Sequence, residues 1–303
     1  MKYNKTLTTL AAAAGLLAAA GTASAAAIIY EGFDYSNGAL AGNGPATGLS
    51  GTWSSAGSNT PNVFGSGGSG LSFTGLTTTG GAAGRASASG GAHSGIALTG
   101  AAQTALTQSG TSIFFTVLVR TDRNSVGNEN FTFAFGTDTL DTTTGADGGV
   151  AAAIASSGNG FGFSMNNFTN SGGNDSTSDF HGYQSVGGTV SRSTSYLDTG
   201  TSVQTLLLAG QIDWVATGND TLSLFNIGDV TATALPTAFA TMSADFNQSL
   251  FDTISFESRQ IGKIDEIRFG TSWSDVGLAV VPEPSAALLG GLGLLALLRR
   301  RRA

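Results

Sequence analysis

Ile113-Phe114-Phe115-Thr116-Val117-Leu118-Val119 is the stretch of this chain that decides its fold class. Nearly all of its residues are apolar, and most are β-branched or aromatic, which favours a β-strand. An apolar run without polar alternation is typical of a strand that is covered on both faces. The sequence therefore predicts a central strand here.

Two neighbouring segments show strand-like alternation. Phe131-Thr-Phe-Ala-Phe135 and Phe161-Gly-Phe-Ser-Met165 each place their large side chains on one face. Stretches 65–91 and 166–178 are poorer in bulky residues and are expected to include loops. About ten short strands joined by Gly, Ser and Asn turns predict an all-β fold, an antiparallel β-sandwich. The other predicted strands are 28–31, 70–74, 203–208, 211–215, 221–227, 251–257 and 263–269.

The composition agrees with a single β-rich core. Of 303 residues, 45 are glycine and only 11% are charged, which suits short strands and tight turns. A hydrophobic content of 41% with 18 phenylalanines argues against wholesale disorder. No Pro-rich or charged linker divides residues 26–281, so we expect one domain there. The chain has no cysteine, which excludes disulfides and thiolate metal sites.

The amino-terminal segment reads as a signal peptide. Lys2 and Lys5 precede an apolar stretch over 7–20, and Ala23-Ser24-Ala25 forms a small-residue cleavage site. We expect signal peptidase to cut so that the mature chain begins near Ala26, with Ala27 as the second choice. The apolar stretch is short for a stable membrane span, so a permanent anchor is the lesser alternative.

The carboxyl-terminal segment has three parts: Pro282-Glu283-Pro284, an uncharged run from Ser285 to Leu298, and Arg299-Arg300-Arg301-Arg302. The run can enter hydrocarbon, but as a helix it would span only about 21 Å of a core that is about 30 Å thick. The positive-inside rule keeps the arginines cytoplasmic and the body outside. A buried helix in a soluble domain is the alternative, and four terminal arginines argue against it.

These three parts, in this order, resemble the PEP-CTERM sorting signal of Gram-negative, biofilm-forming bacteria. The resemblance implies export across the inner membrane, transient membrane insertion of 285–298, and recognition by an exosortase, a membrane-embedded cysteine transpeptidase that cuts near the Pro-Glu-Pro. It also implies a location at the cell surface, the outer envelope or the extracellular matrix, in association with exopolysaccharide.

A second resemblance concerns the body. Tyr30-Glu-Gly-Phe-Asp-Tyr35 stands near its start and Gly262-Lys-Ile-Asp-Glu-Ile-Arg-Phe-Gly270 near its end. With Gln211–Trp214 and Asp220–Phe225 between them, these segments look like strands of a concanavalin A-like or laminin-G-like jelly roll. The resemblance implies that the opening and closing strands pair side by side.

The closing strand holds the most conspicuous acidic pair. Simple alternation places Asp265 on the face that buries Ile267 and Phe269, with Glu266 and Arg268 on the other face. We expect Glu266 and Arg268 to form an exposed ion pair worth roughly 0–1 kcal/mol, and Asp265 to accept hydrogen bonds from loop amides. Retaining glycosidases need two carboxyl groups about 5–5.5 Å apart, which strand neighbours on opposite faces do not provide.

Other candidate chemistry is sparse. His93 and His181 lie in Gly/Ser-rich stretches and are expected to be solvated; two histidines are too few for a zinc site, and no Gly-x-Ser-x-Gly elbow is present. The Gly-x-Gly-x-x-Gly match at 65–70 precedes a strand-like segment and is attributed to chance.

We predict no cofactor, with calcium as the one metal to consider. Oxygen-rich loops could bind it, but none has EF-hand spacing, so a turn-forming role is favoured. Exposed tryptophans would form a glycan platform, whereas burial is expected for Trp53, Trp214 and Trp273. The candidate calcium loops are Asp138 and Asp141 with Asp147, Asn174-Asp175 with Asp179, and Asn219-Asp220.

The two predicted signals contain six of the 13 Lys and Arg residues, so the body is strongly acidic and should repel nucleic acid and anionic membranes. The leading prediction is a non-enzymatic, exported surface or matrix protein with weak binding of glycan or exopolysaccharide. The alternatives are a polysaccharide-degrading glycosidase or lyase on the same scaffold, and a self-associating structural matrix subunit.

Overall fold

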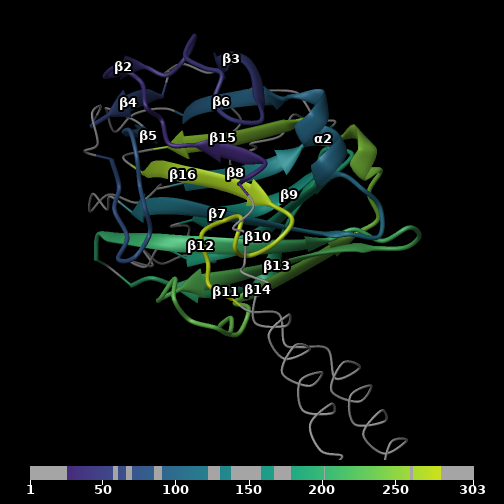
Figure 1. The fold of residues 1–303 in the computed structure, drawn as a ribbon. Coiled ribbons are helices and arrows are strands. Elements are labelled where there is room, and N and C mark those ends of the chain that lie inside the picture. Colours follow the sequence, from purple (N-terminus) through teal and green to yellow (C-terminus); the bar gives the residue numbers. More distant parts are fainter. Residues whose placement is uncertain are drawn as a thin grey trace, which may run out of the picture.

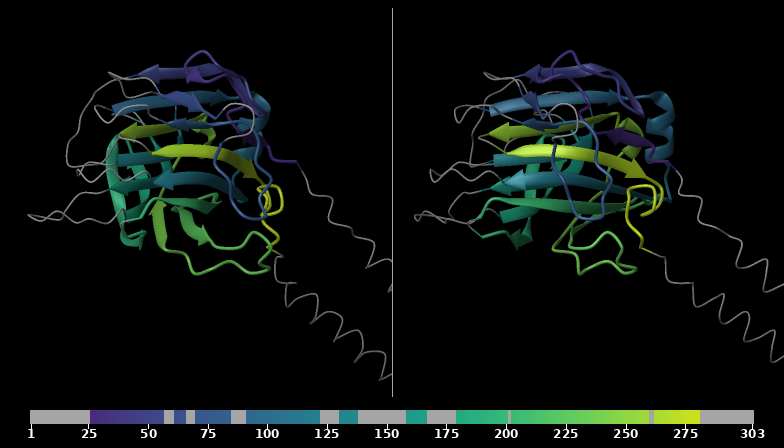
Figure 2. Two further views of the ribbon diagram at one scale, coloured as in Figure 1. Left: turned by 90° about the vertical axis from the view of Figure 1, so that its left-hand side faces the viewer. Right: turned by 60° about the vertical axis from the view of Figure 1, so that its left-hand side comes forward.

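The computed structural model describes residues 26–56, 61–65, 70–84, 91–121, 130–137, 158–166, 179–200, 202–259 and 262–280. These residues form two antiparallel β-sheets that pack face to face (Figures 1 and 2). The predicted antiparallel β-sandwich is confirmed. The predicted signal peptide and the sorting signal from Pro282 onward lie outside the described residues.

The larger sheet has nine strands in the order β14-β13-β12-β7-β16-β5-β4-β2, and β1 also pairs with β16. Its centre is β7, which lies between β12 and β16 as the apolar run predicted. The strands are β1 (Ile29–Glu31), β2 (Gly38–Ala39), β4 (Asn62–Phe64), β5 (Ala82–Gly84), β7 (Ser112–Thr121), β12 (Gln204–Asp213), β13 (Asp220–Ile227), β14 (Ala240–Ala244) and β16 (Lys263–Gly270).

The smaller sheet has seven strands in the order β11-β10-β9-β8-β15-β6-β3. A short helix, α2 (Gly100–Leu106), connects the two sheets, and the Thr99 side chain caps it by accepting a hydrogen bond from the Ala102 amide. The strands are β3 (Leu49–Ala56), β6 (Gly91–Leu98), β8 (Asn130–Gly136), β9 (Gly160–Asn166), β10 (Asp179–Val186), β11 (Thr189–Asp198) and β15 (Thr253–Arg259), and the 3-10 turn η1 (Gln248–Leu250) precedes β15.

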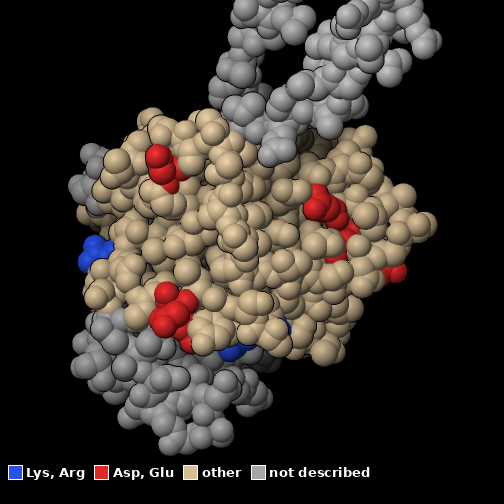
Figure 3. All heavy atoms as spheres, turned by 90° about the horizontal axis from the view of Figure 1, so that it is seen from below, with Lys and Arg blue, Asp and Glu red and all other residues tan. Residues whose placement is uncertain are grey.

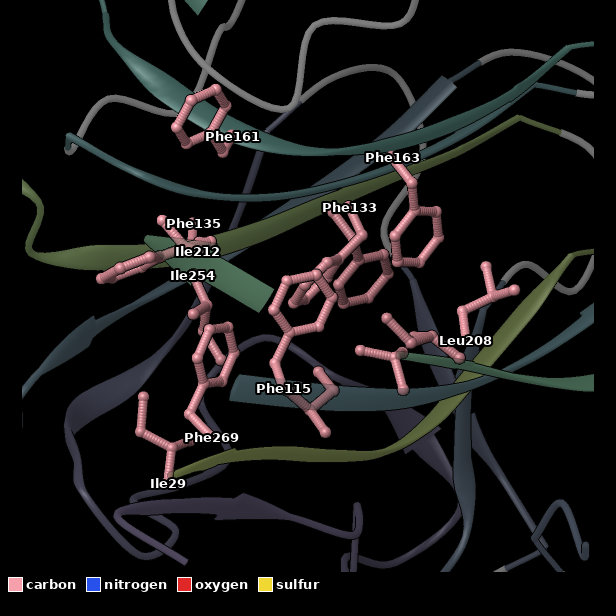
Figure 4. Close-up of a cluster of buried hydrophobic side chains, with 14 of the residues drawn as sticks. Ile29, Phe115, Phe133, Phe135, Phe161, Phe163, Leu208, Ile212, Ile254 and Phe269 are labelled. Carbon is pink, nitrogen blue, oxygen red and sulfur yellow. The ribbon is translucent and has the colours of Figure 1, made fainter. Parts of the chain in front are cut away.

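The main core lies between the sheets and is rich in phenylalanine (Figure 4). Phe115 and Phe269 of the larger sheet stack with ring centroids 5.2 Å apart, and Phe133 and Phe135 of β8 face them. The alternation in β8 and β9 therefore places the large side chains inward, as predicted.

A second core covers the outer face of the larger sheet. We call residues 271–280 the C-terminal strap. Its Trp273, Val276 and Leu278 pack on Leu118 and Phe225, among others. Alternate residues of β7 thus contribute to both cores, which explains the unbroken apolar run of its sequence.

Two predictions of strands were wrong in part. Segments 203–208 and 211–215 belong to one ten-residue strand, β12, because Ala209 and Gly210 continue the ladder with β7. Residues 70–74 form a loop whose Leu71 packs into the second core. Strands rich in Gly, Ser or Ala, such as β3, β6 and β11, were not predicted.

Candidate functional site

Three buried carboxyl groups meet where the first and last strands pair. Strand β1 runs antiparallel to β16, with Tyr30 opposite Arg268 and Glu31 opposite Ile267. Glu31, Asp265 and Glu266 are each at most 1% exposed. The pairing of the opening and closing strands, which the body's resemblance implied, is therefore present and brings these acids together.

A β-bulge in β16 sets their directions. Asp265 pairs with Leu118 and Arg268 with Thr116, so Glu266 and Ile267 together oppose one residue of β7. Glu266 has a φ of 51°, in the left-handed region. The extra residue shifts the alternation, so simple alternation along this strand gave the wrong face for Asp265.

Asp265 lies on the outer face, beside Leu118 of the second core. Its Oδ2 accepts a hydrogen bond from the Leu71 amide at 2.8 Å, and its Oδ1 accepts one from the Glu266 amide at 2.8 Å. The structure thus places a loop amide on Asp265, as expected. Its carboxylate ties the loop before Phe73 to the sheet.

Glu266 and Arg268 form an ion pair of 2.6 Å, but the pair is not exposed as expected. The Glu266 side chain is 0% exposed and that of Arg268 is 13% exposed. Glu266 also accepts hydrogen bonds from the Tyr30 hydroxyl at 3.1 Å and the Thr79 amide at 2.5 Å. The bulge turns this side chain under the loop that carries Thr79, where it links three segments.

Glu31 lies on the main-core side with its carboxylate fully engaged. It accepts hydrogen bonds from the Phe33 amide at 2.7 Å, the Tyr35 hydroxyl at 2.7 Å and the Trp53 indole at 2.9 Å. The short spacing of Glu31, Phe33 and Tyr35 in the sequence allows the Phe33 amide and the Tyr35 hydroxyl to reach the Glu31 carboxylate.

Burial raises the pKa of two of these carboxyl groups, those of Asp265 and Glu31. Burial, and then the charge of Glu266, raises the pKa of Asp265 to about 9, and the two amide donors only partly oppose the rise. Burial also raises the pKa of Glu31, against the hydrogen bonds from Trp53 and Tyr35. Because protein groups already bind all three carboxylates, the cluster holds strands β1 and β16 and the neighbouring loops together. We call Glu31, Asp265 and Glu266 the clasp.

An open groove of about 420 Å³ adjoins the clasp. Tyr30 and Arg268 line it from the sheet, Thr77 and Thr79 from the loop, and Asp275 from the strap. The Arg268 guanidinium lies over the Tyr30 ring, 5.2 Å from its centroid. The sequence analysis did not identify Tyr30 or Asp275 as site residues. The expected pairing of the opening and closing strands, which places Tyr30 opposite Arg268, could have located part of this groove.

The two histidines occupy one cross-strand row on the outer face of the smaller sheet. The row runs through His93, Glu257, Thr132, Ser164 and His181, each directly opposite the next. His93 is only 4% exposed and its Nε2 lies 3.5 Å from a Glu257 oxygen, so the expectation of a solvated loop residue was wrong. Four strand spacings separate the histidines by roughly 19 Å, too far to share a metal.

His181 is half-buried and also lies on a strand, not in a loop. Its Nδ1 is 3.0 Å from the Ser193 carbonyl oxygen, and burial lowers its pKa. Its ring also lies 5.2 Å from the Tyr196 ring, centroid to centroid.

The remaining predicted ligands are structural or undescribed. Trp53, Trp214 and Trp273 are all buried, as expected, and none offers a glycan platform. Asp220 accepts hydrogen bonds from the Val215 and Phe246 amides, which is the expected turn-forming role. The loops with Asp138, Asp141, Asp147 and Asn174-Asp175 lie outside the described residues, as do Ala23, Ala25, Pro282, Glu283, Pro284 and Arg299 to Arg302.

The described ranges contain neither a metal-binding cluster nor a membrane-spanning helix. No group of three or more His, Asp and Glu side chains there is arranged to hold a metal ion. No helix in the same ranges is both long and apolar enough to cross a bilayer. The run 285–298, for which membrane insertion was predicted, is not among them.

The profile of the PEP-CTERM protein-sorting motif matches residues 280–302. The match identifies a signal for export to the cell surface in Gram-negative bacteria and implies processing by an exosortase. No curated protein matches the chain.

Several solved structures are similar in fold. A protein of unknown function from Shewanella oneidensis MR-1 has a TM-score of 0.46 and 12% identity, covering 91% of this chain and 97% of its own. The globular domain of T. cruzi calreticulin has a TM-score of 0.45 and 10% identity, covering 81% and 88%. A legume lectin-like domain from Entamoeba histolytica has a TM-score of 0.36 and 6% identity, covering 73% and 90%.

Proposed function

We propose that this chain is a non-enzymatic β-sandwich protein of the Gram-negative cell surface or extracellular matrix, with weak affinity for glycans. The match of the PEP-CTERM motif to residues 280–302 carries this proposal. A signal peptide over the first 25 residues would start export, and an exosortase would then process the precursor near Pro282-Glu283-Pro284. The sandwich is the part delivered.

The chemistry of the described residues supports a role in binding. The three acids of the clasp are held by amides, hydroxyls and Arg268, which makes them supports of the fold. The visible surface in Figure 3 is largely uncharged, with separate acidic groups and few basic ones. Such a surface suits contact with neutral polymers better than with polyanions.

Expression of the full chain in a Gram-negative host that has an exosortase tests the proposal. We expect the chain in the surface or matrix fraction, with a mass that shows loss of both terminal signals. A Pro282→Ala/Glu283→Ala variant should stay uncut in the inner membrane, while an Asp245→Asn control should be processed normally, because Asp245 is an exposed residue of the sandwich. Full-length chain in the soluble cytoplasm would refute export.

The non-enzymatic part has its own test. The processed protein is incubated with neutral and uronate-containing polysaccharides, and new reducing ends and unsaturated uronates are measured. We expect no release above buffer. Turnover that is lost in a Glu257→Gln or Glu266→Gln variant that still folds would favour the glycosidase or lyase alternative.

A further inference from the structure

Two residues that line the groove, Asp275 and Arg268, each have one buried polar atom without a hydrogen-bond partner among the described residues. Asp275 is 7% exposed, and its Oδ2 accepts hydrogen bonds from the Thr271 and Ser272 amides, both at 2.9 Å. Its other oxygen, Oδ1, is buried and has no hydrogen-bond partner among the described residues. A buried carboxylate oxygen without a donor is costly, so a site for a donor is built into the strap.

Arg268 shows the complementary feature. Its terminal nitrogen donates to Glu266 and to the Thr77 carbonyl, but its Nε is buried and unpartnered within the described part of the chain. Both Arg268 and Asp275 line the same groove. One unused donor and one unused acceptor thus belong to two residues that line the same groove.

The rest of the groove is lined by hydroxyls and one aromatic ring. Thr47, Thr77, Thr79 and Ser274 contribute to its walls, and Tyr30 adds its ring. The volume of about 420 Å³ lies in the range of small-ligand sites, about 300–1,000 Å³. Glu266 neutralises Arg268, and Asp275 adds a negative charge, so the groove disfavours anions.

We propose that this groove binds a neutral saccharide, with one hydroxyl donating to Asp275 Oδ1 and a neighbouring hydroxyl accepting from Arg268 Nε. A vicinal diol both donates and accepts across adjacent positions, which matches the unused pair. The inference rests on the proposed surface function and names the site and class of its glycan ligand. Because the three tryptophans are buried, we expect binding through hydrogen bonds and Tyr30 rather than through a tryptophan platform.

Asp275→Asn is the decisive variant because it replaces one hydrogen-bond acceptor by a donor. The asparagine oxygen can keep the Thr271 and Ser272 amides, while its NH₂ replaces the unused acceptor by a donor. Arg268→Lys removes Nε and keeps a positive charge for Glu266. Asp245→Asn is the matched control: it removes the same charge from the exposed end of β14, four strands away from β16 in the sheet order.

The exported protein and these variants are titrated with neutral β-glucan, galactan and mannan oligosaccharides, with galacturonan as the anionic probe, using calorimetry and ligand-observed NMR. We expect millimolar binding of at least one neutral oligosaccharide and none of galacturonan. Asp275→Asn and Arg268→Lys should weaken it at least tenfold, and Asp245→Asn less than twofold. Thermal melting of each variant confirms that it is folded.

The inference is overturned if no neutral oligosaccharide binds, if galacturonan binds more tightly, or if folded Asp275→Asn binds as the parent does. The competing occupant is the amino group that cleavage after Ala25 would create on Ala26, a residue that also lines the groove. If Asp275→Asn lowers the pKa of that amine without any glycan present, the amine fills the site and the inference fails. Surface localisation of the same variants is scored separately, so a failure of export is distinct from a failure of binding.

Discussion

Thr116 and Thr132 are buried threonines of two central strands with different hydrogen bonding. Thr116 Oγ1 donates to the Val276 carbonyl at 2.9 Å and so attaches the strap to β7. Thr132 is 1% exposed, and its Oγ1 has no partner among the described residues. Burial without a partner is costly for a hydroxyl, whereas a satisfied hydroxyl contributes to stability.

Replacement of each threonine by valine should therefore have opposite effects. Thr116→Val should lower the free energy of unfolding by about 1–3 kcal/mol, because it leaves the Val276 carbonyl unpaired. Thr132→Val should raise it by about 1 kcal/mol, because it removes a polar group that gains nothing from burial. Urea unfolding of both variants measures the difference, and a loss of stability in Thr132→Val would show that its hydroxyl has a partner in solution.

Asp265 gives stability a pH dependence of known sign. Its pKa is raised to about 9 in the folded chain, from about 3.8 when unfolded. Between these values the folded state binds more protons than the unfolded state, so stability falls as pH rises. Glu31, whose pKa is also raised, acts in the same direction, while the two amide donors of Asp265 oppose it.

We expect the free energy of unfolding to decrease from pH 5 to pH 8, by up to about 1.4 kcal/mol per pH unit for one fully protonated carboxyl group. Asp265→Asn should reduce this slope, whatever it does to stability at pH 5, and Asp245→Asn should keep it. Urea unfolding at four pH values provides the slopes. Equal slopes in the parent and Asp265→Asn would mean that Asp265 is ionised in the folded protein.

In strand β12, the Phe115 ring on the neighbouring strand leaves no room for a side chain at Gly210. Gly210 pairs with Phe115, and a Cβ at Gly210 would lie 2.2 Å from two atoms of that ring. The ring is 1% exposed and lies 5.2 Å from the Phe269 ring, so it has little room to move. The close approach explains why β12 continues through Ala209-Gly210, which had suggested a break between two strands.

Gly210→Ala should accordingly destabilise the fold by about 1–3 kcal/mol, the usual cost of overpacking a core. Gly228→Ala is the control, because a Cβ there meets nothing within 4 Å. It should change stability by no more than about 0.5 kcal/mol. Thermal unfolding of the two variants checks both values; similar stability of the two would show that Phe115 can repack.

Strands with large side chains could be predicted from the sequence, and strands with small side chains could not. Strands with bulky residues, such as β7, β8 and β9, could be predicted because periodicity identifies them. Strands such as β6 and β3 could not, because Gly and Ser carry little propensity and the pairing partners decide. Strand β16 could be located, but its bulge depends on contacts with the loop around Thr79, which no local pattern records.

The candidate site could be predicted only in part, because it is assembled from segments far apart in the chain. Tyr30, Arg268 and Asp275 meet only after β1 pairs with β16 and the strap folds back. The resemblance of the opening and closing strands implied the first of these contacts. The folding back of the strap depends on the tertiary packing of Trp273 and Leu278. No local sequence pattern therefore predicted that Asp275 would lie in the groove.

The order of strands also determines how the whole molecule unfolds. Strand β1 pairs with β16, β7 lies between β12 and β16, and β15 lies between β6 and β8. No cut through the sequence separates two groups of strands with cores of their own. The expected single domain should therefore unfold in one cooperative step.

Single-tryptophan variants test this cooperativity. Trp53 reports on the main core, where it contacts Phe33 and Phe256, and Trp273 reports on the strap and the second core. Variants that keep only one of them, with the other two tryptophans replaced by phenylalanine, should each show fluorescence and far-UV circular dichroism midpoints that coincide. If the Trp273 signal changes at lower urea than the circular dichroism of the same variant, the strap opens before the sandwich. Because the strap ends at Val280, where the match to the sorting motif begins, that result would mean that the segment presented for processing detaches while the rest of the domain stays folded.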